Sequence, residues 1–99
     1  LRVHHGLDAV DQRRTAHVLM SAPRSFATPK KRSVTIAGHE TSISLEPMFW
    51  AALERAADDL SKPVNALIAD IDSARLETRP IPNLTSAIRQ WLFDRSLKE

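Results

Sequence analysis

The spacing of hydrophobic and polar residues changes sharply at position 46, and each spacing predicts a different element. Over residues 41–45 (Thr-Ser-Ile-Ser-Leu) aliphatic residues alternate with hydroxyl residues, the period-2 pattern of a strand with one buried face. Glu46-Pro47 ends this pattern, because proline has no N–H for a β ladder but fits the first turn of a helix. The sequence therefore predicts a strand at 41–45 that leads directly into a helix.

Apolar residues then recur at helical spacing in two segments, which Ser61-Lys62-Pro63 separates. The first segment carries Phe49, Trp50, Leu53, Ala56, Ala57 and Leu60, and the second carries Val64, Leu67, Ile68 and Ile71. Two short amphipathic helices are predicted. One strand and two helices of this length cannot bury their apolar faces alone. We therefore expect an obligate dimer in which two chains intertwine.

Residues 33–36 (Ser-Val-Thr-Ile) alternate as clearly as the strand at 41–45. A tight turn at Gly38-His39 would place Val34 opposite Ile43, with the aliphatic residues on one face and the hydroxyls on the other. The sequence therefore predicts a further N-terminal strand that forms a β-hairpin with the strand before the first helix.

A third helix is predicted after an extended linker with two prolines at residues 77–82. Asn83 is suited to cap it, and an apolar stripe follows at Leu84, Ile88, Trp91 and Leu92. We expect this stripe to pack on the helices of the dimer. Phe93 lies off the stripe, which leaves it for a tetramer contact or for a protein partner.

The order of strand, helix and helix, with Pro63-Val64-Asn65 opening the second helix, resembles the ribbon-helix-helix (Arc/MetJ-like) family over residues 40–76. The stretch from 31 to 88 resembles a bacterial subfamily of it with an extra C-terminal helix. The resemblance implies an α+β fold, an intertwined ribbon-helix-helix homodimer and a small transcriptional regulator that binds double-stranded DNA. We divide the chain into a flexible extension (1–29), the ribbon-helix-helix domain (30–76), a linker (77–82) and a C-terminal helix (83–99).

The resemblance also implies which residues meet DNA. Glu40, Ser42 and Ser44 would face base edges, although a hydroxyl discriminates bases poorly and the Glu40 carboxylate repels phosphates. The start of the second helix would clamp a phosphate through the backbone N–H groups of Val64 and Asn65, with Lys62 adding charge. An exposed polar sheet face and a simple break between two helices remain open as alternatives.

The charge is strongly segregated along the chain, although its net value is only +2. Residues 1–33 carry +5, residues 34–78 carry −5 and residues 79–99 carry +2. A protein that holds DNA through phosphates needs its basic groups on the docking face. The acidic centre therefore argues against DNA reading, unless Lys30, Lys31 and Arg32 form an arm that contacts the phosphates.

The width of the predicted sheet raises a second difficulty for DNA reading. If two hairpins pair through the strand at 41–45, the sheet has four strands and a backbone about 14 Å wide. The major groove is about 12 Å wide and admits a two-stranded ribbon. Either the first strand detaches on binding, or this sheet does not enter the groove.

Other chemistry finds little support in the sequence. The chain has no cysteine and only two glycines, and the four histidines (His4, His5, His17 and His39) have no metal-ligand spacing. We expect no enzyme activity, no cofactor and no metal. No apolar run approaches a membrane span, so a cytoplasmic protein is expected. The alternative to DNA binding is a protein-interaction module, antitoxin-like or adaptor, that keeps the dimer fold.

Overall fold

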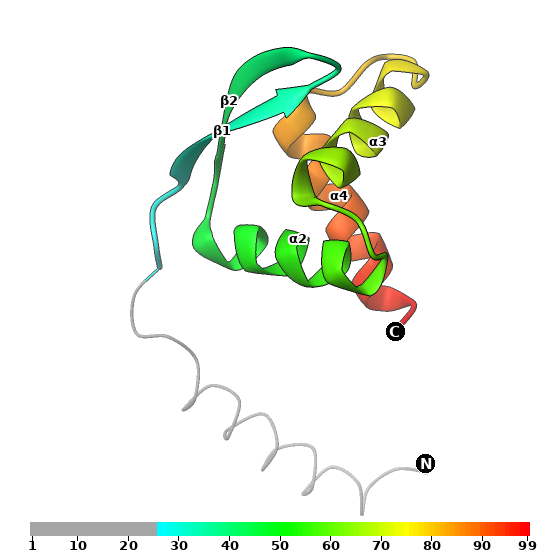
Figure 1. The fold of residues 1–99 in the computed structure, drawn as a ribbon. Helices are drawn as coiled ribbons and strands as arrows, with labels where there is room; N and C mark the ends of the chain where they lie inside the picture. The colour runs from blue at the N-terminus through cyan, green and yellow to red at the C-terminus, as the bar shows by residue number, and fades with distance from the viewer. Residues whose placement is uncertain (1–25) are drawn as a thin grey trace, which may run out of the picture.

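A computed structural model describes residues 26–99 as a β-hairpin followed by three helices (Figure 1). The strands are β1 (Lys30–Ile36) and β2 (His39–Leu45), and the helices are α2 (Pro47–Asp59), α3 (Val64–Leu76) and α4 (Leu84–Leu97). The predicted α+β class and order of elements are confirmed, and both strands are longer than expected. Most of the predicted N-terminal extension, residues 1–25, lies outside the described residues.

The hairpin turns at Ala37 and Gly38, whose φ angles are both positive, at 51° and 81°. Two such residues make a type I′ turn, which matches the twist of the strands. Ile36 then lies opposite His39 and Val34 opposite Thr41. The predicted register is wrong by two residues, because the turn lies one residue earlier than expected. The faces are nevertheless as predicted, since a shift of two residues restores the same phase of the pleat.

The core lies between the inner face of the hairpin and the three helices. Its buried members come from every element: Val34, Ile43, Leu45, Trp50, Leu53, Ala56, Ala57, Leu67, Ile68, Ile71, Ile88 and Leu92. No polar side chain is buried among residues 26–99. In this chain β1 and α4 add cover to the strand and two helices that were expected to need a second chain, and the obligate dimer stays a prediction.

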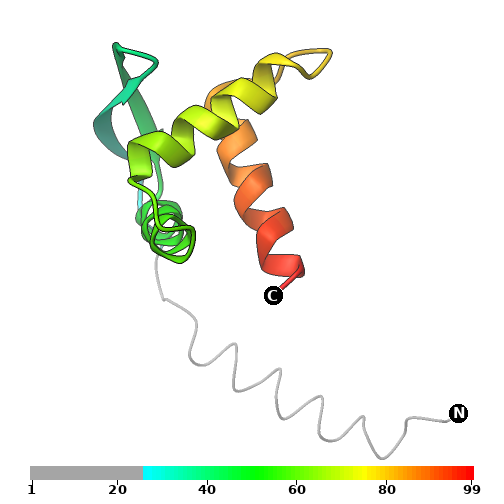
Figure 2. The same cartoon turned by 45° about the vertical axis from the view of Figure 1, so that its right-hand side comes forward.

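The helices surround the inner side of the hairpin. Figure 2 shows α2 end-on below the hairpin, α3 crossing away from it, and α4 running down from beside the middle of α3 after the chain folds back. The hairpin contacts α3 through β1 and α4 through β2. One face of the hairpin is thereby fixed to the helices, and the opposite face is left to solvent.

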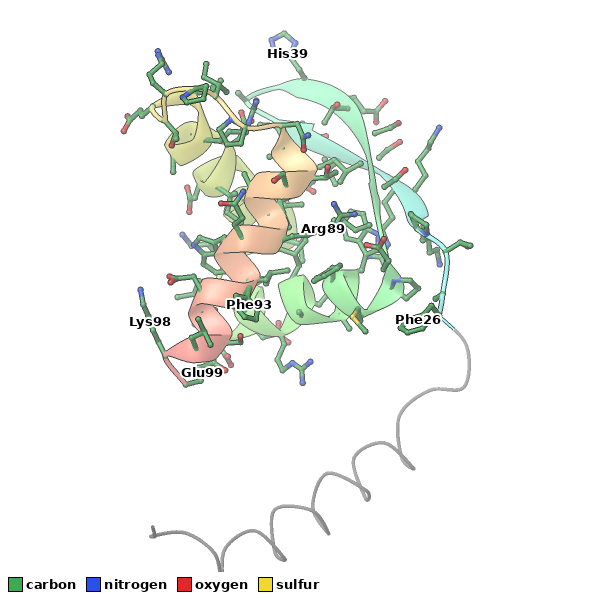
Figure 3. The ribbon with its side chains drawn as sticks, turned by 180° about the vertical axis from the view of Figure 1, so that it is seen from behind. Phe26, His39, Arg89, Phe93, Lys98 and Glu99 are labelled. Carbon is green, nitrogen blue, oxygen red and sulfur yellow. The ribbon has the colours of Figure 1, made fainter. Side chains whose placement is uncertain are left out.

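Helix α4 is part of this core. The Asn83 side chain accepts a hydrogen bond from the backbone N–H of Ser86 at 2.8 Å, which confirms the predicted cap. Ile88 is fully buried and Leu92 nearly so, and both pack inside their own chain. Phe93 is 65% exposed, on the outer side of α4 (Figure 3), as expected for a residue off the stripe.

Candidate functional site

The solvent-facing side of the hairpin is a polar surface of six residues from both strands. We call it the outer face, and its cross-strand pairs are Lys31 with Ser44, Ser33 with Ser42, and Thr35 with Glu40. All six are exposed. The predicted base-facing residues of β2 therefore lie together on one open face.

Two residues of the outer face, Ser33 and Thr35, were not among the predicted site residues. The signal that could have found them is the alternation of residues 33–36, which already placed both hydroxyls on the same side as Ser42. The predicted base-facing residues lie in one strand only, because the resemblance implied a ribbon with one strand from each chain.

The three basic residues before the first predicted strand do not form a free arm, because all three lie in β1. Alternation along the strand turns Lys31 outward and turns Arg32 toward the helices. The Arg32 guanidinium lies 4.7 Å from the centre of the Trp50 ring and 3.1 Å from the Glu54 carboxylate. Arg32 is therefore engaged within the fold, whereas Lys30 and Lys31 are exposed and pair with no carboxylate of residues 26–99.

The open end of β1 is anchored to α2 by a second contact. The indole N–H of Trp50 donates to the backbone carbonyl of Lys30 at 2.8 Å. Trp50 is only 1% exposed, so this bond satisfies a polar atom that the core would otherwise isolate. The strand is thus fixed to the helices at its basic end.

The start of α3 combines free backbone donors with a paired lysine. The first hydrogen bond of α3 runs from the N–H of Leu67 to the Pro63 carbonyl at 3.1 Å. The N–H groups of Val64 and Asn65 come before it and have no acceptor within the helix. No side chain caps this terminus. Lys62, expected to add charge here, lies 2.6 Å from the Asp70 carboxylate, which offsets much of its charge.

Three ion pairs between the basic flanks and the acidic centre offset part of the segregation of charge seen along the sequence. Arg89 of α4 lies 3.1 Å from Glu46, and Arg95 lies 3.4 Å from Asp59. Residues 26–99 carry ten Lys and Arg against ten Asp and Glu. Residues 34–78 still carry −5, and the expectation that basic flanks hold this domain to DNA stays a prediction.

Glu46 is the residue whose titration these contacts change. A hydrogen bond from its own backbone N–H, followed by one from Arg89, lowers the pKa of its carboxyl below the ordinary value of 4.5. A lowered folded-state pKa means that this carboxylate stabilises the fold above pH 4.5. That contribution is lost as the pH falls through the folded-state pKa.

We expect Arg89→Gln to raise the pKa of Glu46 without restoring its ordinary value, because the larger cause is the backbone hydrogen bond, which the substitution leaves in place. Carboxyl carbon shifts of the labelled protein, followed by NMR against pH, measure this directly. Gln90→Ala, one position along α4, is the control. An unchanged Glu46 titration in the Arg89 variant would contradict the contribution of this contact.

Residues 29–95 match the sequence profile of the Ribbon-helix-helix domain family. The chain belongs to this family. The match runs from just before β1 into the last turn of α4, so most of the third helix of this ribbon-helix-helix protein lies within the matched region. The family is a non-enzymatic, DNA-binding fold, and its members typically bind DNA as dimers. No curated protein and no solved structure matches the chain.

The described residues carry neither a membrane-spanning helix nor a metal-binding cluster. No helix in residues 26–99 is both long and apolar enough to cross a membrane. No cluster of three or more His, Asp or Glu residues there could hold a metal ion.

Proposed function

We propose that this protein is a small transcriptional regulator of the ribbon-helix-helix type that acts in the bacterial cytoplasm. The observation that carries the proposal is the outer face, an open row of hydroxyl groups on a hairpin whose other face is fixed to the helices. A hydroxyl can donate to or accept from base edges, and a two-stranded ribbon fits the major groove. Family membership supports the same function.

In this proposal each group keeps a separate task. Glu40, Ser42 and Ser44 face base edges, while Lys30 and Lys31 contact phosphates at the open end of the hairpin. The backbone N–H groups of Val64 and Asn65 clamp a further phosphate, as helix N-termini can. Lys62 contributes little to that clamp because of Asp70. Arg32, expected to contact phosphate, serves the fold instead.

The protein acts as a homodimer of subunits that are already folded. Support comes from the complete core of the single chain and from the exposed apolar residues of α4. Phe93 and Leu97, one helical turn apart, are 65% and 68% exposed and would contact the second subunit. Dimerisation would then align two hairpins on two neighbouring half-sites.

The experiment that tests DNA binding removes the one acidic group of the outer face. We expect Glu40→Gln to strengthen binding to random-sequence duplex several-fold at low salt, because a charge that repels phosphates disappears. Fluorescence anisotropy with a labelled duplex measures this. Asp58→Asn on α2 is the matched control. Asp58 is exposed, forms no ion pair with a Lys or Arg of residues 26–99, and lies outside the hairpin.

A wild-type protein that binds no duplex at low salt would contradict this proposal. Equal affinity of wild type and Glu40→Gln would show that the outer face does not approach phosphates. Either result favours the second candidate function.

That candidate is a protein-interaction module, antitoxin-like or adaptor, that keeps the fold without reading DNA. The balanced charge of residues 26–99 favours it, because a neutral domain attracts DNA weakly. A groove of about 300 Å³ between α2 and α4 offers a place for a partner segment. Its apolar floor comes from Ala52, Ala56 and Leu92, with Arg55, Asp59 and Arg95 along its rim.

A further inference from the structure

We infer that Arg89 of α4 is a positioning residue for DNA recognition, because it holds the junction between β2 and α2 and so sets the direction of the strand that carries Ser42 and Ser44. This inference rests on the proposed DNA-binding function and gives the third helix a part in it. The contacts that carry it lie within one chain, and they are the same whichever chain pairs with the free edge of β2.

The junction between β2 and α2 is a single residue. β2 ends at Leu45 and α2 begins at Pro47, so Glu46 alone connects them. Leu45 is fully buried. The Glu46 carbonyl accepts the N–H groups of Phe49 at 2.9 Å and of Trp50 at 3.2 Å, which starts the helix at once. Since one residue contributes only two soft backbone angles, the conformation of Glu46 determines the angle between strand and helix.

The Glu46 side chain is held by α4 and not by its own helix. Glu46 is the N-cap residue of α2, yet its side chain accepts no capping hydrogen bond from the first turn of that helix. The carboxylate instead accepts a hydrogen bond from Nη2 of Arg89 at 3.1 Å and one from the Glu46 backbone N–H. The bond to its own N–H ties the carboxylate to the backbone, so fixing the carboxylate also fixes the junction.

Arg89 also contacts the first turn of α2 itself. Its guanidinium carbon lies 5.6 Å from the centre of the Phe49 ring, within the range of a cation–π contact. The side chains of Arg89, Glu46 and Phe49 are all partly buried, so solvent screens these contacts less than it screens a fully exposed pair. Arg89 therefore holds the start of α2 at residue 46 and at residue 49.

Arg89 can hold this junction because α4 is itself fixed to the core. The neighbouring Ile88 is fully buried and Leu92 nearly so, and α4 contacts β2 as well as α2 and α3. Further along α4, Arg95 lies 3.4 Å from Asp59, the last residue of α2. The two arginines of α4 thus hold α2 at both ends, and Arg89 is the one at the end that meets the ribbon.

The placement of the base-facing hydroxyls follows from this arrangement. Ser42 and Ser44 lie on β2 just before Glu46 and are exposed on the outer face. A change of angle at the junction tilts β2 and moves both hydroxyls relative to the base edges, whose hydrogen bonds need close geometry. Attraction between lysines and phosphates varies slowly with distance and tolerates the same tilt. Loss of Arg89 should therefore affect sequence reading more than general attraction to DNA.

The test compares a selected duplex with a random one. Duplexes are selected by the wild-type protein from a pool with a randomised centre, and fluorescence anisotropy gives the affinity for a selected and for a random-sequence duplex. We expect Arg89→Gln to lose about tenfold for the selected duplex, less than deletion of one base contact in each of two subunits would cost. For the random duplex it should lose no more than Arg55→Gln. That variant is the matched control, because Arg55 is an exposed arginine of α2 that pairs with no carboxylate of residues 26–99.

Glu46→Ala shows how Arg89 acts. We expect this variant also to weaken binding to the selected duplex, and the double variant with Arg89→Gln to be no weaker than the weaker single variant, since both substitutions break the same contact. Arg89→Lys keeps a donor for Glu46 and should bind the selected duplex more tightly than Arg89→Gln does. If Arg89 only neutralised a carboxylate near the phosphates, Glu46→Ala would instead strengthen binding, and that result would overturn the inference.

A measurement on the free protein tests the junction without DNA. We expect Arg89→Gln to shift the backbone amide NMR resonances of Ser42 and Ser44, and Arg55→Gln to leave them in place. Unshifted resonances in the Arg89 variant would overturn the inference whatever the protein binds.

The DNA measurements separate this inference from the proposed function. Equal losses of Arg89→Gln on both duplexes, or binding of the selected duplex as tight as that of Arg55→Gln, would overturn the inference and leave the proposed function standing. A wild-type protein that selects and binds no duplex would overturn both. Circular dichroism melting curves of each variant separate a displaced ribbon from a lost fold.

Discussion

Replacing Ile88 by alanine is expected to lower the free energy of unfolding by about 2–5 kcal/mol, the usual cost of deleting a fully buried aliphatic side chain. Ile88 lies on α4 and is 0% exposed within its own chain. Domains of this size are stable by about 5–15 kcal/mol, so the variant should be close to unfolding at physiological temperature. Urea denaturation followed by circular dichroism measures the change.

Leu97→Ala on the same helix is the control, because Leu97 is 68% exposed and its truncation should stay within about 0.5 kcal/mol of wild type. At protein concentrations too low for the proposed dimer to form, the wild-type protein should still unfold cooperatively, since each chain contains its own core, and the midpoint should rise only where the dimer is populated. A chain that is unfolded at low concentration would show that the dimer is obligate. A small effect of Ile88→Ala would show that α4 only covers a core which forms without it.

Replacing Lys30 and Lys31 together by alanine is expected to flatten the slope of log K against log salt for duplex DNA by about two per subunit, close to one for each lost phosphate contact. These two lysines lie at the open end of the hairpin, and neither pairs with a carboxylate of residues 26–99. Anisotropy titrations at several salt concentrations give the slope.

Arg32→Gln should behave differently, although Arg32 is the next residue along the same strand. Its guanidinium is engaged by Trp50 and Glu54, so the salt slope should hold while the unfolding midpoint falls. The double variant Arg55→Ala with Lys98→Ala removes the same charge from α2 and from just beyond α4, and it controls for net charge alone. An unchanged slope for the lysine pair would exclude the hairpin end as the electrostatic anchor.

The order and type of the elements follow from the sequence because local spacing determines them. Residues 41–45 alternate with period 2, Pro47 cannot continue a ladder, and Asn83 caps a helix through its own side chain. The outward direction of Ser42 and Ser44 is also local, since alternate residues of a strand point to opposite faces. These features can be predicted without knowing which other segments pack against them.

The tertiary structure decided which distant groups meet, and these contacts changed the account of the site. The residues that neighbour Arg32 in sequence do not predict its contacts with Glu54 and Trp50. The ion pair between Arg89 and Glu46 is likewise not predicted from local sequence. The register depended on a turn one residue earlier than expected, because Ala37 accepts a positive φ that its side chain disfavours. The charge of a surface and the burial of a side chain both depend on segments that lie far apart in sequence and meet only in the fold. The sequence by itself therefore determined the elements and their faces, whereas only the packing of β1 and α4 onto the other helices decided that one chain completes the core.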